Sequence, residues 1–225
     1  MSIVVIASFA EDHFERNGTT SILPGGPAYY IQNALRSLSV EPIIYSGSKP
    51  AIVSIALIDG EERGKLVEVK PILIPKRIQA DAIIVSTVDQ EFALQDLPEG
   101  IRFTLVDLQG YLRSAKGKEE ISSQEVWKKI SCVKVTEEEF EKLPAQLREE
   151  QKQRELIITR GSQSVTVWEK GIAYQIPVRP VVVTHALGAG DRFVAAYAVA
   201  RYRGDEPEKA AEFAADFVSK SLSEQ

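Results

Sequence analysis

The chain has 225 residues, of which 44% are hydrophobic and 26% charged, and a formal net charge of −5, which are ordinary values for a globular domain with a well-buried core. The acidic balance argues against a nucleic-acid-binding protein, one cysteine excludes an internal disulfide framework, and two histidines exclude a histidine-rich metal cage. No apolar run is long enough to span a bilayer, and the first run lacks the basic flank of a signal peptide, so we expect a cytoplasmic protein that binds neither nucleic acid nor membranes.

The first fifty residues predict two strands that flank a helix. Residues 3–7 form a short continuous apolar run with β-branched side chains, which is typical of a buried strand. A polar segment at 11–21 follows. A Gly-Gly-Pro segment at 25–27 then precedes residues 28–38, whose apolar positions recur at helical spacing. Residues 42–46 predict a second buried strand.

Residues 51–73 show a different pattern. Side chains alternate along the segment, and Asp59-Gly60 marks a turn in its middle. A polar outward face with a central turn indicates an antiparallel hairpin and not part of a parallel core. We therefore expect a small β lid at 51–73, inserted in a single α/β domain that spans residues 1–225.

From residue 82 onward, strand and helix patterns alternate. Apolar β-branched runs predict strands at 82–86, 103–107, 133–135, 156–159 and 181–183, and a hairpin at 165–168 and 172–176. Helices are expected at 91–97, 123–130, 137–153 with an interruption at Pro144, 192–202 and 206–222. This order is typical of a doubly wound, mostly parallel sheet, in which ligands bind outside the carboxyl ends of the strands.

A glycine-rich segment precedes the predicted helix at 192–202. Gly188 and Gly190 flank Ala189, and such small residues expose the N–H groups of a helix N-terminus, where the dipole favours an anion. Asp191 would repel a bound phosphate unless it accepts a proton, so we interpret it as a general base beside a phosphoryl-transfer site. The alternative is a tight turn followed by a first-turn acid, and the segment taken alone favours that alternative.

The order of these motifs resembles that of the ribokinase-like (PfkB) sugar kinase family. An early glycine motif is matched at 25–28 and a late one at 188–191, with the β lid between them. Three further segments are similar to motifs of the family: residues 107–113 to the Asp-x-Gln-Gly segment of archaeal members similar to inositol kinases, residues 136–139 to Asn-x-x-Glu, and residues 159–161 to the Thr-x-Gly turn. The resemblance covers most of the chain and implies a ribokinase-like α/β fold.

The resemblance also implies an activity, which is the ATP- and Mg²⁺-dependent phosphorylation of a hydroxyl group. The expected acceptor is a small, inositol-like polyol or a sugar, with a nucleoside as second choice. Asp191 would deprotonate the hydroxyl, and the N–H groups of Gly188, Ala189 and Gly190 would hold the charge of the transferring phosphoryl group. A homodimer formed through the lid is a further expectation.

The remaining site residues follow from the same resemblance. The acceptor would be bound by Asp12, Gly25, Gly26, Tyr30 and Arg113. The nucleotide would be bound by Thr159, Gly161 and His185, and Glu139 would help to order Mg²⁺. Each of these side chains also has an ordinary structural alternative, such as a turn former, a solvated helix acid or a packed aromatic ring.

Four residues depart from the pattern of the family. His185-Ala186 stands where the family carries Asp-Thr, and Tyr30 and Thr136 each stand where it carries Asn. The replacement by His185-Ala186 favours a second hypothesis, in which a catalytically degenerate member binds a nucleotide or a sugar and acts as a regulatory protein. A phosphomethylpyrimidine-type kinase on the same fold is a third, less favoured hypothesis.

Overall fold

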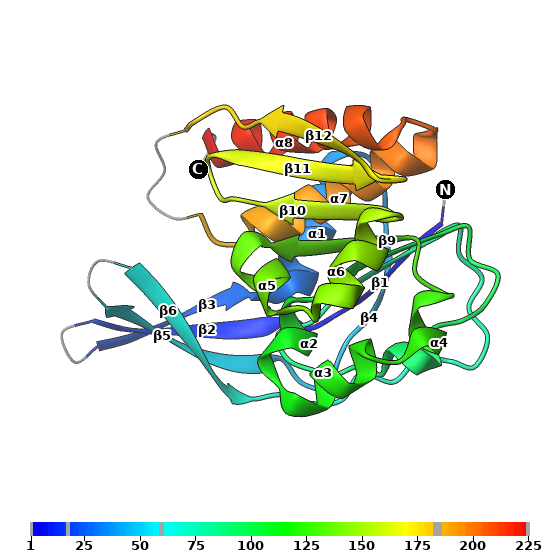
Figure 1. Ribbon diagram of the computed structural model, residues 1–225. Coiled ribbons are helices and arrows are strands. Elements are labelled where there is room, and N and C mark those ends of the chain that lie inside the picture. Colours follow the sequence, from blue (N-terminus) through cyan, green and yellow to red (C-terminus); the bar gives the residue numbers. More distant parts are fainter. Residues whose placement is uncertain (1, 17–18, 59–60, 182–185, 224–225) are drawn as a thin grey trace.

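An eight-stranded sheet forms the centre of the computed structural model, which describes residues 2–16, 19–58, 61–181 and 186–223 (Figure 1). Its strand order is β12-β11-β10-β9-β8-β7-β1-β4. The strands from β10 to β4 run parallel to one another, whereas β11 pairs antiparallel with both β10 and β12. The strands are β1 (Ile3–Ala7), β4 (Ile43–Tyr45), β7 (Ala82–Ser86), β8 (Phe103–Asp107), β9 (Cys132–Thr136), β10 (Glu155–Thr159), β11 (Ser164–Glu169) and β12 (Ile172–Pro177). The predicted doubly wound, mostly parallel sheet is confirmed.

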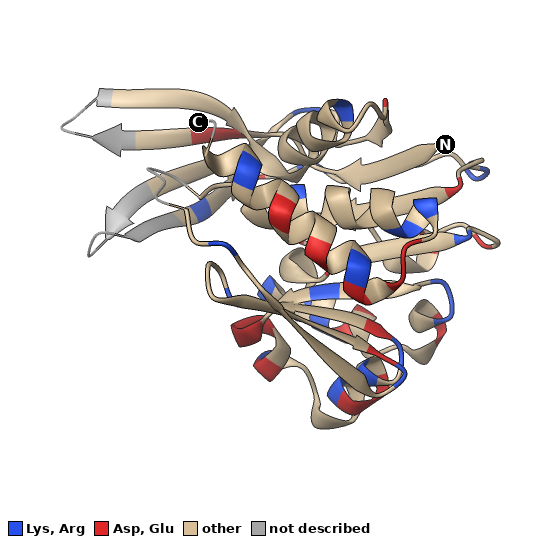
Figure 2. Ribbon diagram, turned by 90° about the horizontal axis from the view of Figure 1, so that it is seen from above, with Lys and Arg blue, Asp and Glu red and all other residues tan. Residues whose placement is uncertain are grey.

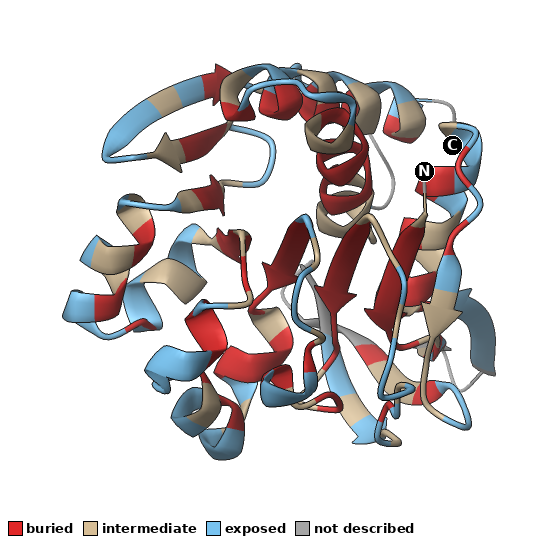
Figure 3. Ribbon diagram, turned by 90° about the vertical axis from the view of Figure 1, so that its right-hand side faces the viewer, coloured by how far each residue is buried: buried red, intermediate tan, exposed pale blue. Residues whose placement is uncertain are grey.

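Helices cover both faces of this sheet, so its central strands are buried (Figure 3). Every residue of β1, β7 and β8 is buried, which explains their continuous apolar runs. Ile3 and Val5 pack on one face with α1 (Gly26–Ser37), α7 (Ala189–Arg203) and α8 (Pro207–Ser223). Val4 and Ile6 pack on the other face with the shorter helices. These are η1 (Leu94–Asp96), α2 (Gln109–Arg113), α3 (Ala115–Ile121), α4 (Gln124–Trp127), α5 (Glu137–Lys142) and α6 (Ala145–Lys152).

A second sheet projects from one side of the first (Figure 1). Its order is β3-β2-β5-β6, and its strands are β2 (Ala10–Arg16), β3 (Thr19–Gly25), β5 (Ala51–Ile58) and β6 (Glu61–Glu68). The expected hairpin is therefore present as β5 and β6, although it ends before residue 73. In the polar segment at 11–21, residues 11–16 and 19–21 belong to strands, which the composition does not predict. That sheet is stabilised by backbone pairing of β2 with the distant β5, and a mostly exposed sheet needs few apolar side chains.

Several other predicted elements differ from the structure. β4 is an edge strand with Ile43 half exposed, not a second buried strand. The helix expected at 91–97 is the short 3₁₀ helix η1, and the charged stretch divides at Pro144 into α5 and α6, because proline cannot donate the helical hydrogen bond. The strand expected at 181–183 lies almost entirely outside the described residues.

The short helices α2 and α3 were not predicted, because close packing at two glycines positions them and periodicity does not. A Cβ on Gly110 would lie 2.4 Å from the Asp89 carbonyl oxygen, and one on Gly117 would lie 2.3 Å from that of Tyr111. Only residues without side chains fit at such distances.

The surface carries charges of both signs. Figure 2 shows acidic and basic residues interspersed along α8 and over the neighbouring elements. Interspersed charge does not create the positive field that nucleic acids require. Within the described ranges, no helix is both long and apolar enough to cross a bilayer.

Candidate active site

A cavity of about 550 Å³ lies at the carboxyl ends of the parallel strands, which is where an α/β sheet binds its ligands. Asp107 at the end of β8 and Thr159 at the end of β10 contribute to its wall, and the first turn of α7 adds Asp191. α8 closes one side with the apolar side chains of Val218 and Leu222. We call this the strand-end cavity.

The first turn of α7 presents backbone N–H groups to the cavity. Gly188 precedes the helix with φ 72°, a left-handed conformation that favours glycine, and a Cβ there would lie 2.1 Å from the Tyr30 ring. The Ala189 N–H donates to the Ala186 carbonyl over 3.2 Å, so this predicted anion donor already has a partner. The N–H groups of the next two residues precede the first helical hydrogen bond, which Arg192 donates to Gly188. Those two groups are placed to bind an anion.

Asp191 lies in the same turn and has a strongly shifted pKa. The residue as a whole is half-buried, but its carboxyl group is desolvated. This burial, reinforced by the nearby Asp107 carboxylate, raises the pKa of Asp191 to about 7. The Lys134 ammonium group and a 3.0 Å hydrogen bond from Ser86 Oγ to Asp191 Oδ1 act in the opposite direction. A carboxyl group with a pKa near 7 suits general-base catalysis at neutral pH.

A buried ion pair lies at the wall of the cavity below this turn. Lys134 Nζ lies 2.8 Å from Asp107 Oδ2, and the two side chains are 5% and 1% exposed. Asp107 Oδ1 accepts the Gln109 N–H over 3.1 Å. Burial lowers the pKa of Lys134, but Asp107 and two further carboxylates outweigh that effect and raise it, so the ammonium form is retained.

Four of the five predicted acceptor-binding residues lie together beside α7. Asp12 is buried in β2, and a Cβ on Gly25 would lie 2.0 Å from its Oδ2, so the carboxylate lies directly against that glycine. Gly26 begins α1 with φ 82°, close to the backbone of β2. Burial, followed by the Asp12 carboxylate, raises the pKa of Tyr30 to about 12, and the Tyr30 ring touches Gly188. A carboxylate and a phenol therefore lie next to the anion-binding turn.

The fifth predicted acceptor residue, Arg113, lies at the base of the second sheet. It is exposed at the end of α2 and donates from Nη1 to the Val88 carbonyl over 2.8 Å. Val88 packs with Ala10 and Ala51 under the second sheet. The structure thus gives Arg113 a partner at the base of that sheet and does not bring it to the strand-end cavity.

The predicted nucleotide and metal residues have mixed placements. Thr159 and Gly161 line the strand-end cavity, whereas His185 lies outside the described residues. Glu139 forms a capping box at the start of α5, in which its Oε2 accepts the Thr136 N–H over 2.8 Å while its own N–H donates to Thr136 Oγ1 over 3.2 Å. Among the described residues, no group of three or more His, Cys, Asp or Glu side chains could hold a metal ion.

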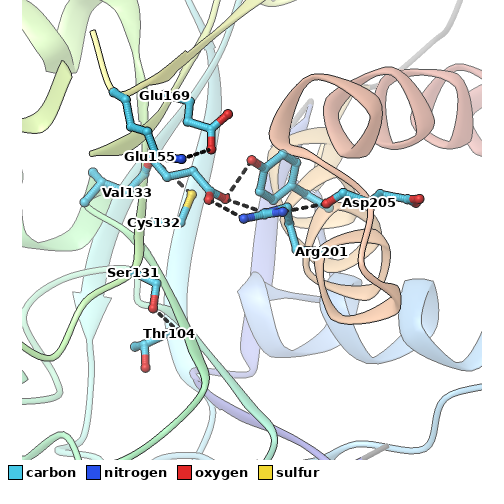
Figure 4. Close-up of polar contacts among 10 residues, drawn as sticks. Thr104, Ser131, Cys132, Val133, Glu155, Glu169, Arg201 and Asp205 are labelled. Atoms are coloured by element: carbon cyan, nitrogen blue, oxygen red, sulfur yellow. Dashed lines mark hydrogen bonds and ion pairs between the residues drawn. The ribbon is translucent and has the colours of Figure 1, made fainter. Parts of the chain in front are cut away.

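The other end of α7 is anchored to the sheet, which fixes the position of Asp191. Tyr197 donates from its hydroxyl to Glu155 Oε1 over 2.8 Å, and Arg201 Nη2 lies 2.8 Å from Glu155 Oε2. Figure 4 shows Glu155 and Arg201 pointing toward one another between β10 and α7, with Cys132 beside them. The carboxyl-terminal half of the helix is thereby joined to the start of β10.

A larger cavity, of about 740 Å³, lies at the opposite edge of the sheet. It is lined by Ile101 and Ser131, which precede β8 and β9. Its Lys129 ammonium group donates to the Gln95 and Leu97 carbonyls. Because this cavity lies at the amino ends of the strands and does not include the glycine segment, we do not assign the chemistry to it.

Three residues of the candidate site were missed by sequence analysis. Asp107 begins a motif that was recognised, but Arg113 was selected from that motif. Lys134 carried a usable signal, because a lysine inside the apolar run of a buried strand is rare unless it is paired. Ser86 ends a predicted strand and gave no signal, since its partner Asp191 is 105 residues away.

Comparison with known proteins agrees with this geometry. Residues 75–224 match the model of the pfkB family carbohydrate kinases. A structure described as a pyrophosphate-dependent kinase in the ribokinase family, complexed with a pyrophosphate analogue and myo-inositol, is 18% identical with a TM-score of 0.75, over 99% of this chain and 95% of that one. The Methanocaldococcus jannaschii nucleoside kinase is 18% identical with a TM-score of 0.74, over 98% and 91% of the two chains.

A third similar structure is the ribokinase from Cryptococcus neoformans var. grubii serotype A in complex with ADP. It is 14% identical with a TM-score of 0.76, over 99% of this chain and 94% of that one. No curated protein sequence matches the chain. Because the family model covers well over half of the residues, the chain belongs to the pfkB family of carbohydrate kinases.

Proposed function

We propose that the chain transfers the terminal phosphoryl group of ATP to a hydroxyl of a small polyol or sugar, with a nucleoside as the second choice of acceptor. The observation that carries this proposal is the position of Asp191. Its carboxyl group, with a pKa of about 7, lies in the anion-binding turn of α7 and beside the cluster around Asp12 and Tyr30. Proton acceptor, phosphate site and hydroxyl-binding groups thus share one location.

The proposed chemistry needs little more than positioning and charge. An acceptor hydroxyl near Asp12 would donate its proton to Asp191 as the oxygen attacks the phosphorus atom. The charge on the transferring group would be held by the free N–H groups of the first turn of α7. The second sheet, which carries Asp12, would cover the acceptor and exclude water.

The donor half of the strand-end cavity suits a nucleotide. Its walls near α8 are apolar, with Val178, Val218 and Leu222, and such a surface accommodates a purine ring. Thr159 and Gly161 lie between that wall and the glycine segment along the edge of the sheet. A pyrophosphate donor, as in one of the similar structures, would leave the apolar part unused, so the donor is tested directly below.

Magnesium would be supplied with the donor. Proteins commonly hold Mg²⁺ with one or two carboxylates, while phosphates and water complete the coordination. The single predicted carboxylate, Glu139, uses Oε2 for the capping box, which leaves Oε1 for a metal-bound water. This donor set fits a metal ion that is bound chiefly by the nucleotide.

The test is a transfer assay with purified protein and Mg²⁺. ATP and inorganic pyrophosphate are each combined with myo-inositol, common sugars and nucleosides, and the phosphorylated acceptor is detected by ³¹P NMR and mass spectrometry. We expect transfer from ATP to at least one polyol or sugar, reduced at least a thousandfold by Asp191→Asn. The matched control, Asp216→Asn on the surface of α8, should act like the wild type. If the folded Asp191→Asn variant turns over as fast as the wild type, Asp191 is not the general base.

A regulatory binding protein is the second candidate function. The ring of Tyr30 lies against Gly188, and the Arg192 guanidinium lies 5.0 Å from the ring centroid, so two bulky groups occupy the space beside the glycine segment. Nucleotide or sugar binding that raises the melting temperature without any transfer would support this candidate.

We also propose that the second sheet forms a homodimer in the cytoplasm, so that the lid serves both closure and assembly. Ile22 and Leu23 on β3 and Val67 on β6 are more than half exposed, and such apolar side chains favour association. Light scattering would detect the dimer, and Leu23→Lys should convert it to a monomer.

A further inference from the structure

We propose that Lys134 binds the donor phosphate group that faces the acceptor, and that Asp107 holds its ammonium group in place until that phosphate enters. The inference rests on the proposed kinase function. It adds a buried cation to a site whose other contributions are backbone N–H groups and the Asp191 carboxylate.

The ion pair lies at the cavity wall although its two members are buried. Lys134 in β9 and Asp107 at the end of β8 are partners in the strand register. Nζ and Oδ2 are 2.8 Å apart, and the side chains are almost inaccessible to solvent. Both residues nevertheless line the strand-end cavity. A ligand inside that cavity can therefore meet this charge, while bulk water largely cannot.

Gly190 leaves the ammonium group uncovered on the side of α7. A Cβ on Gly190 would have Lys134 Nζ as its nearest neighbour, at 3.2 Å. The missing side chain thus keeps open the space between the first turn of α7 and the charge. One phosphate group could bind the free N–H groups of that turn and the Lys134 ammonium group together.

The charges around the cavity indicate why a cation is needed at this end. Asp107 and Asp191 both line the cavity and would repel a phosphate, and Glu139 acts on Lys134 electrostatically. Among the described lining residues the cations are Lys134 and Arg179. Arg179 follows β12, and its carbonyl accepts a hydrogen bond from α8, so it lies at the other end. Lys134 is the cation beside Asp191.

A purely structural role does not explain the buried ion pair of Lys134 and Asp107. Burying two charges is costly, and well-packed apolar residues often stabilise a core equally well. An ammonium group has three N–H donors. Within the described part of the chain, Lys134 Nζ donates one hydrogen bond, to Asp107 Oδ2. The other two donors remain for phosphate oxygens.

The test measures anion binding without turnover, so that its outcome is independent of the transfer assay. Inorganic pyrophosphate is titrated by calorimetry into the wild type, Asp107→Asn, and the double variant Asp107→Asn/Lys134→Gln. The double variant keeps the net charge and leaves no unpaired buried charge. We expect it to bind pyrophosphate at least tenfold more weakly than the wild type. Asp107→Asn alone, which keeps the cation and removes a competing carboxylate, should bind at least as tightly as the wild type.

Two results would overturn the inference: wild-type affinity in the folded double variant, or equal losses in the single and double variants. If the double variant does not fold, ¹⁵N NMR of the wild-type ammonium groups decides instead. Protons on the buried Lys134 ammonium group exchange slowly, and its resonance should shift on addition of pyrophosphate. An unmoved resonance at saturation would exclude contact. Pyrophosphate binding through Lys134 without transfer to any acceptor would refute only the kinase proposal.

Discussion

The Ser86 hydroxyl donates a 3.0 Å hydrogen bond to Oδ1 of Asp191 and thereby joins the end of β7 to the first turn of α7. Ser86 is fully buried, so the bond is shielded from competing water and gains strength. It orients one carboxylate oxygen and favours the ionised form of Asp191. The other oxygen, Oδ2, then remains for the acceptor hydroxyl.

Replacing this serine should shift the pH dependence of transfer. Asp191 acts as a base only when ionised, so kcat/KM should rise with pH through about 7, the pKa of Asp191 in the free protein. Ser86→Ala removes a hydrogen bond that lowers this pKa, and we expect the acid limb to move upward by roughly half to one pH unit. The control is Ser221→Ala on α8, whose hydroxyl donates to the Val218 carbonyl in the same helix. An unmoved acid limb in a folded Ser86→Ala protein would contradict this role.

The same pKa predicts how stability depends on pH. Folding raises the pKa of Asp191 from 3.8 to about 7, so between these values the folded protein binds more protons than the unfolded chain. The contribution of Asp191 to the free energy of unfolding therefore falls as pH rises from about 4 to about 7 and is constant outside that window. Asp191→Asn should lose this dependence and be more stable than the wild type at pH 8, by on the order of 2 kcal/mol. Urea denaturation at pH 5 and pH 8 measures both effects, and parallel pH profiles would disprove the shift.

Gly188 should tolerate no side chain. Its φ of 72° is strained for other residues, and a Cβ would lie 2.1 Å from the Tyr30 ring. We expect Gly188→Ala to lower the free energy of unfolding by roughly 2 kcal/mol and to weaken pyrophosphate binding, because the first turn of α7 must shift. When Tyr30→Ala is added to Gly188→Ala, only the part of the lost stability that the clash with the ring causes should be recovered. Gly204→Ala, also at positive φ but with no atom within 4 Å of its Cβ, separates the strain from the clash.

The anchor at the far end of α7 should affect stability without affecting the pKa of the base. Glu155 accepts hydrogen bonds from Tyr197 and Arg201 in a mostly buried setting. Glu155→Gln should lower the free energy of unfolding by about 2–3 kcal/mol, because it leaves the Arg201 charge without its partner. Removing the exposed pair of Glu212 with Lys209 by Glu212→Gln should hardly change the free energy of unfolding, because water screens such a pair. Similar costs for the two variants, measured by urea denaturation, would argue against a buried anchor.

Much of the fold could be predicted because the central strands are buried on both faces. A strand such as β1 or β7 must be apolar throughout, so its sequence identifies it without knowledge of its neighbours. The strands β2 and β3 could not be found in this way. Their sequences lack a continuous apolar run, and the sheet is held together by the pairing of β2 with β3 and with β5, which follows α1 and β4 in the chain.

The candidate site likewise contains residues that the sequence could identify and residues whose contacts only the fold shows. Gly188, Gly190 and Asp191 lie in one short segment, and the clustering of small residues before a helix was enough to predict an anion site there. Glu139 and Arg113 were selected by motif, and the motif did not indicate the partners that the structure shows, which are the cap of α5 and the Val88 carbonyl. A motif identifies a position in the chain, whereas a side chain finds its partners in space.

The amino-acid sequence by itself determined the alternation of strands and helices, the glycine turn before α7 and the acid that follows it. These features arise from interactions among residues close together in the chain, such as helical periodicity, backbone freedom and the helix dipole. Only the tertiary structure decided that Ser86 bonds to Asp191, that Lys134 lies under Gly190 and that Tyr30 covers Gly188. These contacts join residues from different strands and helices, and they exist because parallel strands bring their carboxyl ends to one edge of the sheet.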